Sequence, residues 1–293
     1  MSKTIKVLFL GDMVGRPGRE AVQKFLNQNN EYDFVIANVE NASHGFGLTK
    51  KNHDELISYG IDCMTSGNHI WDKKDVYTYI DDSSVLIRPL NYHKKERGVG
   101  YRIFNDKIIV INILGKTFMQ PVLCPFQTLY DIMVSLNEAY NLAEKIVIVD
   151  FHAEATAEKI CFAHFAKSIG VSAVLGTHTH VQTADEKLIE CDFTLKEDFE
   201  YFPKAFKDGI LTSKKTMAYI SDVGFCGSYK SVIGMEYESS LKRLVSSIPE
   251  RFDVAVDEIR QINAVCIEFD FEGGFAQKIE RINLNYNYEE MKA

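Results

Sequence analysis

The chain has 293 residues, of which 46% are hydrophobic and 25% are charged, the proportions of a globular protein. Its 33 Lys and Arg against 41 Asp and Glu give a formal net charge of −8, which argues against binding duplex nucleic acid through a basic surface. No stretch approaches the ~20 apolar residues of a membrane span, and the first apolar run is too short for a secretory signal. We therefore expect a cytoplasmic protein.

The same counts bear on domain organisation and on the cysteines. Length alone permits two domains, but α/β folds of ~250 residues are often single, and no Pro- or Ser-rich linker or internal repeat divides this sequence. We expect one domain over residues 1–293.

The six cysteines are scattered and include no C-x-x-C pair, so we expect free, buried thiols and no zinc ribbon or disulfide framework.

Six short apolar runs, rich in Val, Ile, Leu or Phe, are typical of strands that are buried on both faces. They cover residues 5–10, 34–38, 63–66, 108–114, 146–150 and 173–175. Amphipathic stretches between them predict helices over residues 20–29, 49–59 and 156–169, and the last two begin at a possible threonine cap and stop at a glycine. This alternation predicts an α/β layered fold.

Two segments depart from the alternation and predict β-hairpins. Residues 100–104 and 107–114 flank an Asn-Asp turn, and residues 263–271 and 275–284 flank a Glu-Gly-Gly turn. Antiparallel hairpins late in the chain suggest a second sheet packed on the first. The stretch over residues 181–217 is polar and irregular, which predicts long surface loops.

Polar side chains follow five of the predicted strands. They are Asp12, then Glu40 and Asn41, then Asn68 and His69, then His152, and finally His178 and His180. In open α/β sheets, sites form beyond the carboxyl ends of the strands, so we expect these side chains to meet at one edge. Imidazole, carboxylate and amide groups are the ligands of transition metals and hard cations, and the series therefore predicts a metal site.

Each of these residues alone has a common structural explanation. An Asp after a strand is usually a turn or cap residue, and a lone His152 is more often a hydrogen-bonded core histidine. His178 and His180 are a stronger signal, because in an extended segment residues i and i+2 point the same way and two imidazoles can reach one metal. The repetition at five strand ends favours function. His44, in a Gly-containing loop, is a candidate for lining the substrate site.

A dinucleotide-binding fold is the main competing interpretation. Gly11, Gly15 and Gly18 follow a predicted strand and precede a predicted helix, and Glu40 ends the next strand. The spacing of these glycines is not G-x-G-x-x-G, and the interpretation leaves the histidines at 152, 178 and 180 without a role. We therefore disfavour it.

The strand-end series resembles the calcineurin-like metallophosphoesterase superfamily over residues 11–180. Two positions depart from the general pattern: Val14 stands where a His is usual, and Glu40-Asn41 replaces the usual Gly-Asp. These departures resemble one branch, the YmdB-like bacterial phosphodiesterases, whose motifs extend over most of the chain. The matching segments are Gly11-Asp12, Glu40-Asn41-Ala42, Gly67-Asn68-His69-x-Trp71-Asp72, His152-Ala153-Glu154 and Gly176-Thr177-His178-Thr179-His180. Phe225-Cys226-Gly227-Ser228 differs from the Met-Thr-Gly-Pro that is common in the branch.

The resemblance implies a four-layer αββα sandwich with two metal ions, iron or manganese. By resemblance, one ion would be held by Asp12, Glu40, Asn41 and His180. Glu40 would bridge to a second ion, whose other ligands would be Asn68, His152 and His178. His69 would lie at the substrate and neutralise or protonate the leaving alkoxide. For Asp72 we expect a helix cap rather than a partner that orients His69.

The implied reaction is hydrolysis of a small phosphodiester such as a 2′,3′- or 3′,5′-cyclic nucleotide. Two alternatives stay open: a phosphomonoesterase that uses the same site, and a regulatory protein whose metal site serves binding alone. RNA as a substrate or partner is open through a local basic patch, although the net charge does not support it. We expect no membrane association and leave self-association of the chain open.

Overall fold

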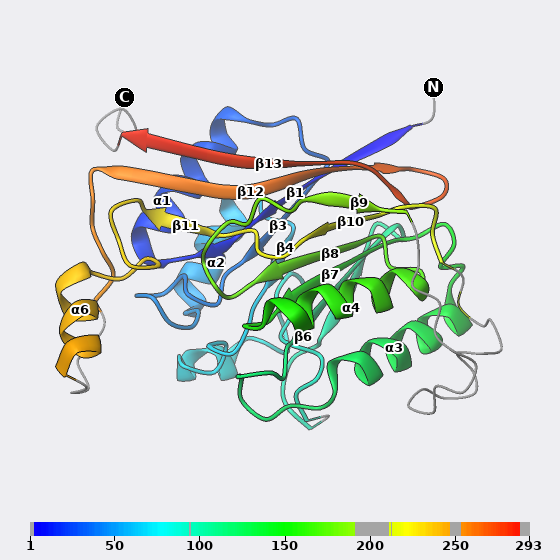
Figure 1. The fold of residues 1–293 in the computed structure, drawn as a ribbon, viewed down its shortest axis with the longest axis horizontal. Helices are drawn as coiled ribbons and strands as arrows, with labels where there is room; N and C mark the ends of the chain where they lie inside the picture. The colour runs from blue at the N-terminus through cyan, green and yellow to red at the C-terminus, as the bar shows by residue number, and fades with distance from the viewer. Residues whose placement is uncertain (1–2, 94, 191–210, 212, 247–252, 288–293) are drawn as a thin grey trace.

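The computed structural model describes residues 3–93, 95–190, 211, 213–246 and 253–287. It contains two mixed β-sheets and the helices that pack on them (Figure 1). The first sheet has the strand order β2 (Asp12–Met13), β11 (Phe225–Ser228), β12 (Ile259–Asp270), β1 (Thr4–Leu10), β3 (Phe34–Asn38) and β4 (Cys63–Thr65), with β13 (Ala276–Asn287) paired to β12. The second has the order β5 (Tyr101–Phe104), β6 (Ile108–Leu114), β7 (Ile146–His152), β8 (Ala173–Thr177), β10 (Met217–Ile220) and β9 (Lys187–Ile189).

The described helices are α1 (Gly15–Gln28), α2 (Lys50–Ser58), α3 (Pro125–Ala139), α4 (Thr156–Ser168) and α6 (Tyr237–Ser246), with a short 3₁₀ helix η1 (Lys74–Thr78). Helices α3 and α4 lie together along the second sheet in Figure 1. None of the described helices is long and apolar enough to cross a membrane.

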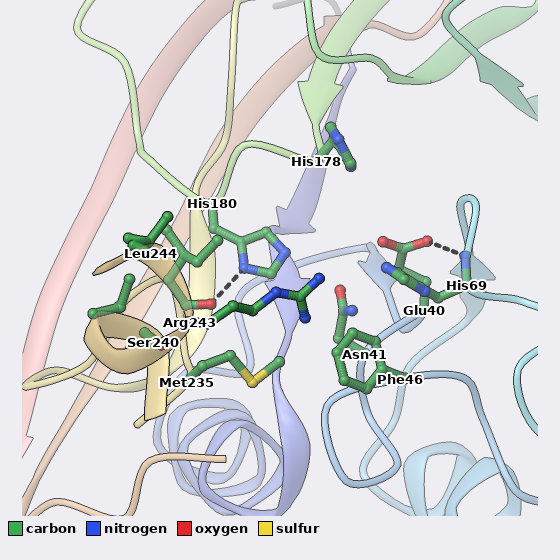
Figure 2. A pocket seen from close by; sticks show the side chains of 12 residues that line it. Glu40, Asn41, Phe46, His69, His178, His180, Met235, Ser240, Arg243 and Leu244 are labelled. Atoms are coloured by element: carbon green, nitrogen blue, oxygen red, sulfur yellow. Dashed lines mark hydrogen bonds between the residues drawn. The ribbon is translucent and has the colours of Figure 1, made fainter. Parts of the chain in front are cut away.

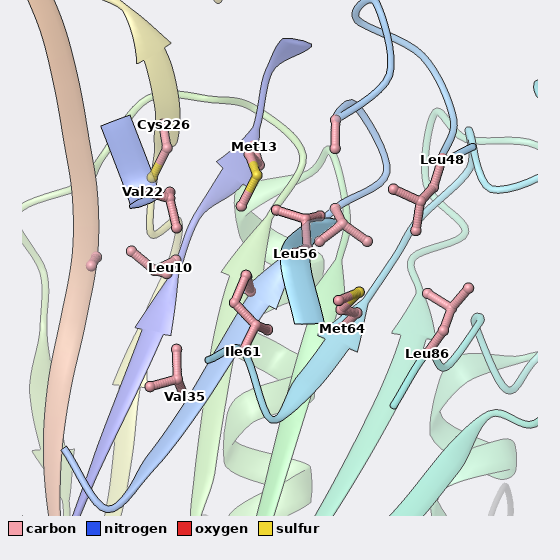
Figure 3. Packing of buried hydrophobic residues seen from close by; sticks show 14 of the residues in the cluster. Leu10, Met13, Val22, Val35, Leu48, Leu56, Ile61, Met64, Leu86 and Cys226 are labelled. Atoms are coloured by element: carbon pink, nitrogen blue, oxygen red, sulfur yellow. The ribbon is translucent and has the colours of Figure 1, made fainter. Parts of the chain in front are cut away.

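The buried apolar residues form three main clusters that follow from strand alternation. Leu8 and Leu10 of β1 pack toward α1 and α2, whereas Val7 and Phe9, which point to the other face, pack against the second sheet. Figure 3 shows part of the first cluster, including Leu10. The third cluster joins the second sheet to α3 and α4. The two sheets are therefore held together by a core of their own.

The predicted strands and helices are present, with shifted ends. The Thr49 side chain accepts a hydrogen bond from the Asn52 N–H and caps α2 as expected. Helix α1 begins at Gly15, five residues before the predicted start, because Pro17 is compatible with a first turn. The predicted cap at Thr156 is wrong: Thr156 is already helical and is preceded by Ala155, which makes no side-chain cap bond. Helix α3 was not predicted.

Both predicted hairpins are confirmed, but the second belongs to a different sheet than expected. Asn105 and Asp106 both have φ of 51°, as a two-residue turn with left-handed positions requires. Strand β12 has its hairpin partner β13 on one edge and, on the other, β1, with which it pairs antiparallel over seven residues, followed by β11, so the hairpin completes the first sheet. Polar residues such as Arg260, Asn263 and Glu268 interrupt its apolar sequence, yet residues 262–265 are all buried, so both faces of β12 are covered there.

The loop and cysteine predictions are confirmed only in part. Within residues 181–217, β9 is a strand and Met217 begins β10, while residues 191–210 and 212 lie outside the described residues. Five cysteines are described and all are free. Cys63 and Cys226 are buried, but Cys124 and Cys161 are exposed, so the expectation of burial is wrong for those two.

Candidate metal and active site

The carboxyl ends of parallel strands bring the predicted residues to one edge of the molecule. Strands β1, β3 and β4 run parallel in the first sheet, and β6, β7 and β8 run parallel in the second. Asp12, Glu40 and Asn68 follow strands of the first sheet. His152 ends β7, and His178 follows β8. The two sets of side chains face each other across the junction between the sheets.

The closest contacts of this group converge on one nitrogen of His152. Its Nε2 lies 3.1 Å from Glu40 Oε1, 3.0 Å from Asn68 Oδ1 and 3.1 Å from His178 Nδ1. Glu40, His152 and His178 each offer a donor atom, and these atoms lie within 4.8 Å of one another. Glu40 and His152 are almost wholly buried. These three residues form a group that could hold a metal ion.

A hydrogen-bonded chain behind His152 fixes which of its nitrogens faces the cluster. Thr177 Oγ1 donates to Asp150 Oδ1 at 2.7 Å and therefore accepts from His152 Nδ1–H at 2.8 Å. The Asn38 amide donates to the other oxygen of Asp150 at 3.0 Å. With its proton on Nδ1, the neutral imidazole presents the lone pair of Nε2 to the cluster, as a metal ligand must.

Asp12 and Asn41 carry buried oxygen atoms that no hydrogen bond satisfies among the described residues. Asp12 Oδ2 accepts from the His178 N–H at 3.1 Å, but Asp12 Oδ1 has no hydrogen-bond partner and lies 3.7 Å from His180 Nε2. The Asn41 amide donates to Gly45 O at 2.9 Å, and its Oδ1 is also unsatisfied. His180 Nδ1 donates to Ile233 O at 2.8 Å, which leaves its Nε2 as an acceptor. Such orphaned acceptors are costly unless a cation binds them.

Burial and the charges placed close together shift several protonation equilibria at the site. Burial raises the pKa of Asp12. Burial alone would raise the pKa of Glu40 and lower that of His152. The opposite charges of the two groups and the hydrogen bond between them act more strongly, so the pKa of Glu40 falls and that of His152 rises. Burial, with the charge of His152 added, lowers the pKa of His178 to about 3. An ionised Glu40 and a neutral His178 are the states in which each binds metal.

Gly67 is required by the close approach of these ligands. A Cβ at this position would lie 2.3 Å from Glu40 Oε2 and 2.4 Å from His152 Nε2. No side chain fits there, because a Cβ contact below 3.0 Å forces its neighbours apart, and those neighbours are two ligand atoms. The glycine of the Gly-Asn-His motif therefore makes room for the cluster.

His178 and His180 reach the site by a backbone that differs from the predicted one. Their φ angles are 97° and 62°, in the left-handed region, so the segment is not extended and the expected alternation does not apply. The two rings consequently go to different neighbours: His178 to His152, and His180 to Asp12. Non-glycine residues in this region store strain of the kind found at functional sites.

His69 lies beside the cluster and lines the cavity next to it. Its N–H donates to Glu40 Oε2 at 2.9 Å, while its Nδ1 is 2.8 Å from Asp72 Oδ2. The expectation that Asp72 caps a helix is wrong, because η1 begins at Lys74 without a side-chain cap bond. Asp72 orients His69 instead. The ring of Phe46 meets the imidazole edge-on at 4.8 Å.

These residues open into a cavity of about 360 Å³. Glu40, His69 and His178 lie on one side, and Met235 and Leu244 on the other (Figure 2). Arg243 of α6 extends its guanidinium between His180 and Asn41 in this view. His44 does not line the cavity. It lines a neighbouring pocket, together with Arg16, Arg19 and Lys73, that shares Phe46 as a wall.

Several residues of the site were not predicted from sequence. Thr177 lies within a recognised motif and Asp150 ends a predicted strand, so their position beside His152 was a usable signal. Glu154, two residues after His152, places Oε2 3.2 Å from His178 Nε2. Ile233 and Arg243 come from a part of the chain without any motif, and nothing in the sequence marked them.

Comparison with known proteins identifies the family over most of the chain. The sequence matches the family described as YmdB-like protein over residues 8–199 and 206–282. A 2′,3′-cyclic-nucleotide 2′-phosphodiesterase of Bacillus subtilis strain 168 is 38% identical over 290 residues, covering 96% of this chain and 97% of that protein.

Two solved structures resemble this one over nearly their full lengths. A hypothetical protein from Thermus thermophilus has a TM-score of 0.78 at 34% identity and covers 96% of this chain and 99% of its own. A phosphatase from Mycoplasma pneumoniae has a TM-score of 0.80 at 31% identity, with coverage of 100% and 97%. The chain is therefore a hydrolase that belongs to the YmdB-like family.

Proposed function

We propose that the chain hydrolyses small phosphodiesters, 2′,3′-cyclic nucleotides foremost, at a centre of two metal ions. Asp12, Glu40, Asn41 and His180 would hold one ion. Glu40 would bridge to the second, which Asn68, His152 and His178 would complete. The mixture of imidazole nitrogens with carboxylate and amide oxygens suits iron or manganese.

One observation carries this proposal. The Nε2 lone pair of His152 faces three groups at 3.0–3.1 Å, the carboxylate of Glu40, the amide oxygen of Asn68 and Nδ1 of His178. Two imidazoles, a carboxylate and an amide oxygen that converge on one point are donors that a single cation can bind together. The unsatisfied oxygens of Asp12 and Asn41 extend the same argument to the neighbouring position.

The mechanism follows from the positions of this chain's side chains. Metal ions, when bound, supply Lewis acidity that activates a water and neutralises the phosphoryl oxygens. The water oxygen forms a bond to phosphorus as the bond from phosphorus to the leaving oxygen breaks. His69, held by Asp72, gives a proton to that leaving oxygen. Opening a 2′,3′-cyclic phosphate at O2′ in this way yields a nucleoside 3′-phosphate.

Two further observations support the proposed substrate, and the packing of the core supports the proposed fold. The Bacillus subtilis relative is named for 2′,3′-cyclic nucleotides, and the cavity volume of about 360 Å³ lies in the range of small-molecule sites. One hydrophobic cluster packs helices on the first sheet, one packs the two sheets together, and one packs helices on the second sheet. This order supports a four-layer αββα sandwich that works as one domain. Activity on 3′,5′-cyclic nucleotides belongs to the same proposal.

A phosphomonoesterase is the second candidate, favoured by the phosphatase from Mycoplasma pneumoniae, which has a TM-score of 0.80 to this structure. The deciding experiment combines elemental analysis of the purified protein with kcat/KM for 2′,3′-cyclic AMP, 3′,5′-cyclic AMP and p-nitrophenyl phosphate. We expect about two metal ions per chain and a preference for the 2′,3′-cyclic diester. Activity on the monoester alone would contradict the diesterase assignment. Metal-loaded protein that is inert on every ester would favour a binding role.

A further inference from the structure

The wall of the cavity that faces the metal-ligand group carries exposed apolar side chains next to Ser240 and Arg243. Ile233 and Leu244 line it and are 48% and 79% exposed, and Met235 and Phe46 adjoin them. Figure 2 shows Leu244 and Met235 opposite Glu40 and His178, with Phe46 between Met235 and His69. Exposed apolar side chains that gather at the mouth of a polar site mark a surface that binds an apolar group. The cavity thus has one end suited to phosphate and another suited to a flat, weakly polar group.

The wall is built on a strained turn. Val232 and Met235 exchange two backbone hydrogen bonds of 2.8 and 2.9 Å, and between them Ile233 has φ of 48°. A β-branched residue is a clear outlier in this region, since its side chain crowds its own backbone. Folding alone does not require an isoleucine there, because glycine would adopt the same angle without strain. Strain kept at the edge of a site points to a function for the side chain.

The same residue also contacts the metal-ligand group. The Ile233 carbonyl accepts the hydrogen bond from His180 Nδ1 at 2.8 Å, while its side chain lines the cavity. Ile233 therefore joins the wall of the cavity to the hydrogen bond that orients His180. Ile233 is in this sense a positioning residue as well as part of the wall.

We propose that the wall made by Phe46, Ile233, Met235 and Leu244 binds the nucleoside part of the substrate, with its base against Ile233 and Leu244. This inference rests on the proposed function, which places the phosphate at the opposite end. On this proposal, contact with the wall is what makes the enzyme prefer nucleotide esters over cyclic phosphates that lack a nucleoside. Loss of one such apolar contact lowers discrimination by roughly 10-fold or more.

The test compares two substrates with the same five-membered cyclic phosphate, 2′,3′-cyclic AMP and ethylene phosphate, which lacks a nucleoside. We expect Ile233→Gly and Leu244→Ala to lower the ratio of their kcat/KM values about 10-fold. Ile233→Gly keeps the carbonyl for His180, and glycine accepts the φ of 48° freely. Leu241→Ala is the matched control, because Leu241 is 43% exposed on the same helix and does not line the cavity.

A binding measurement tests whether the wall contacts the nucleoside without relying on hydrolysis. Calorimetry with adenosine 3′-monophosphate and with inorganic phosphate gives an affinity ratio that should fall in both wall variants and hold in Leu241→Ala. An unchanged ratio in both wall variants, or an equal fall in the control, would overturn the inference. If the wild-type protein binds the nucleotide but hydrolyses neither ester, the proposed function fails while the wall is still tested.

Discussion

The two sheets contribute different chemistry to the site. Strands of the first sheet are followed by oxygen donors, Asp12, Glu40 and Asn68, whereas strands of the second lead to the nitrogen donors His152, His178 and His180. Neither sheet carries a complete ligand set in our proposal. The apolar core between the sheets therefore does more than stabilise the fold, because its packing brings the two kinds of donor within 3.0–3.1 Å of each other.

The largest expected effect comes from the first sheet, at Glu40. Glu40→Gln keeps the shape but removes the charge that bridges both positions, so we expect loss of bound metal and a fall in kcat/KM of ~10³-fold or more. Elemental analysis with kinetics measures both, and Glu31→Gln at an exposed position is the control. A variant that keeps two ions and normal activity would refute the bridging role.

A substitution at His69 distinguishes proton donation from metal binding on the first sheet's side of the site. We expect His69→Ala to lower kcat by ~10²-fold or more, because the leaving oxygen loses its proton donor, while metal content stays at the wild-type value. The loss should be smaller for esters with a p-nitrophenolate leaving group, which departs without a proton. Loss of metal in this variant would show instead that His69 belongs to the ligand set.

The second sheet is tested through the residues behind its nitrogen donors. Thr177→Val removes the acceptor of His152 Nδ1–H and leaves Asp150 short of a donor. We expect metal affinity to fall by roughly 10- to 100-fold, the usual effect of losing a group that orients a ligand. Metal titration measures it, with Thr117→Val at an exposed position as the control. Unchanged affinity would mean that the second sheet holds His152 by packing alone.

The smallest effect is expected at Asp72. Asp72→Asn weakens the contact of 2.8 Å to His69 Nδ1 and should lower kcat by about 10-fold or less, with metal content unchanged. The double variant with His69→Ala should be no slower than His69→Ala alone, since two residues that act through one contact are not additive. Additive losses in this cycle would assign Asp72 a separate function.

The sequence predicted the part of the site that local pattern encodes. Each parallel strand ends at the same edge, so Asp12, Glu40, Asn68 and His152 could be placed there from their positions after apolar runs. The left-handed backbone of His178 and His180 could not be predicted, because the surrounding contacts impose it against the preference of the residues. Asp72 was expected to cap a helix, but η1 begins only at Lys74, and a turn in which the Asp72 N–H donates to His69 O brings the two side chains together.

The remaining errors arise from contacts between distant segments. The second hairpin was assigned to the wrong sheet because an antiparallel pattern shows a partner within the hairpin but not the neighbour on its other side. Ile233 and Leu244 look like ordinary apolar residues, and only their place beside the cavity makes their exposure informative. The fold class and the candidate metal ligands can thus be predicted from local sequence pattern, whereas the residues that line the substrate cavity can be identified only from the tertiary structure.

The pairing of β1 with β12 has a consequence for how the protein is made. Residues 4–10 emerge early from the ribosome, yet the strand that pairs with one of their edges, residues 264–270, is among the last to be translated. Until then that edge of β1 is an open template for pairing with other chains. Asp12 follows β1, so we expect the nascent chain to acquire its full metal affinity only after translation has passed residue 270, which favours loading of metal after release.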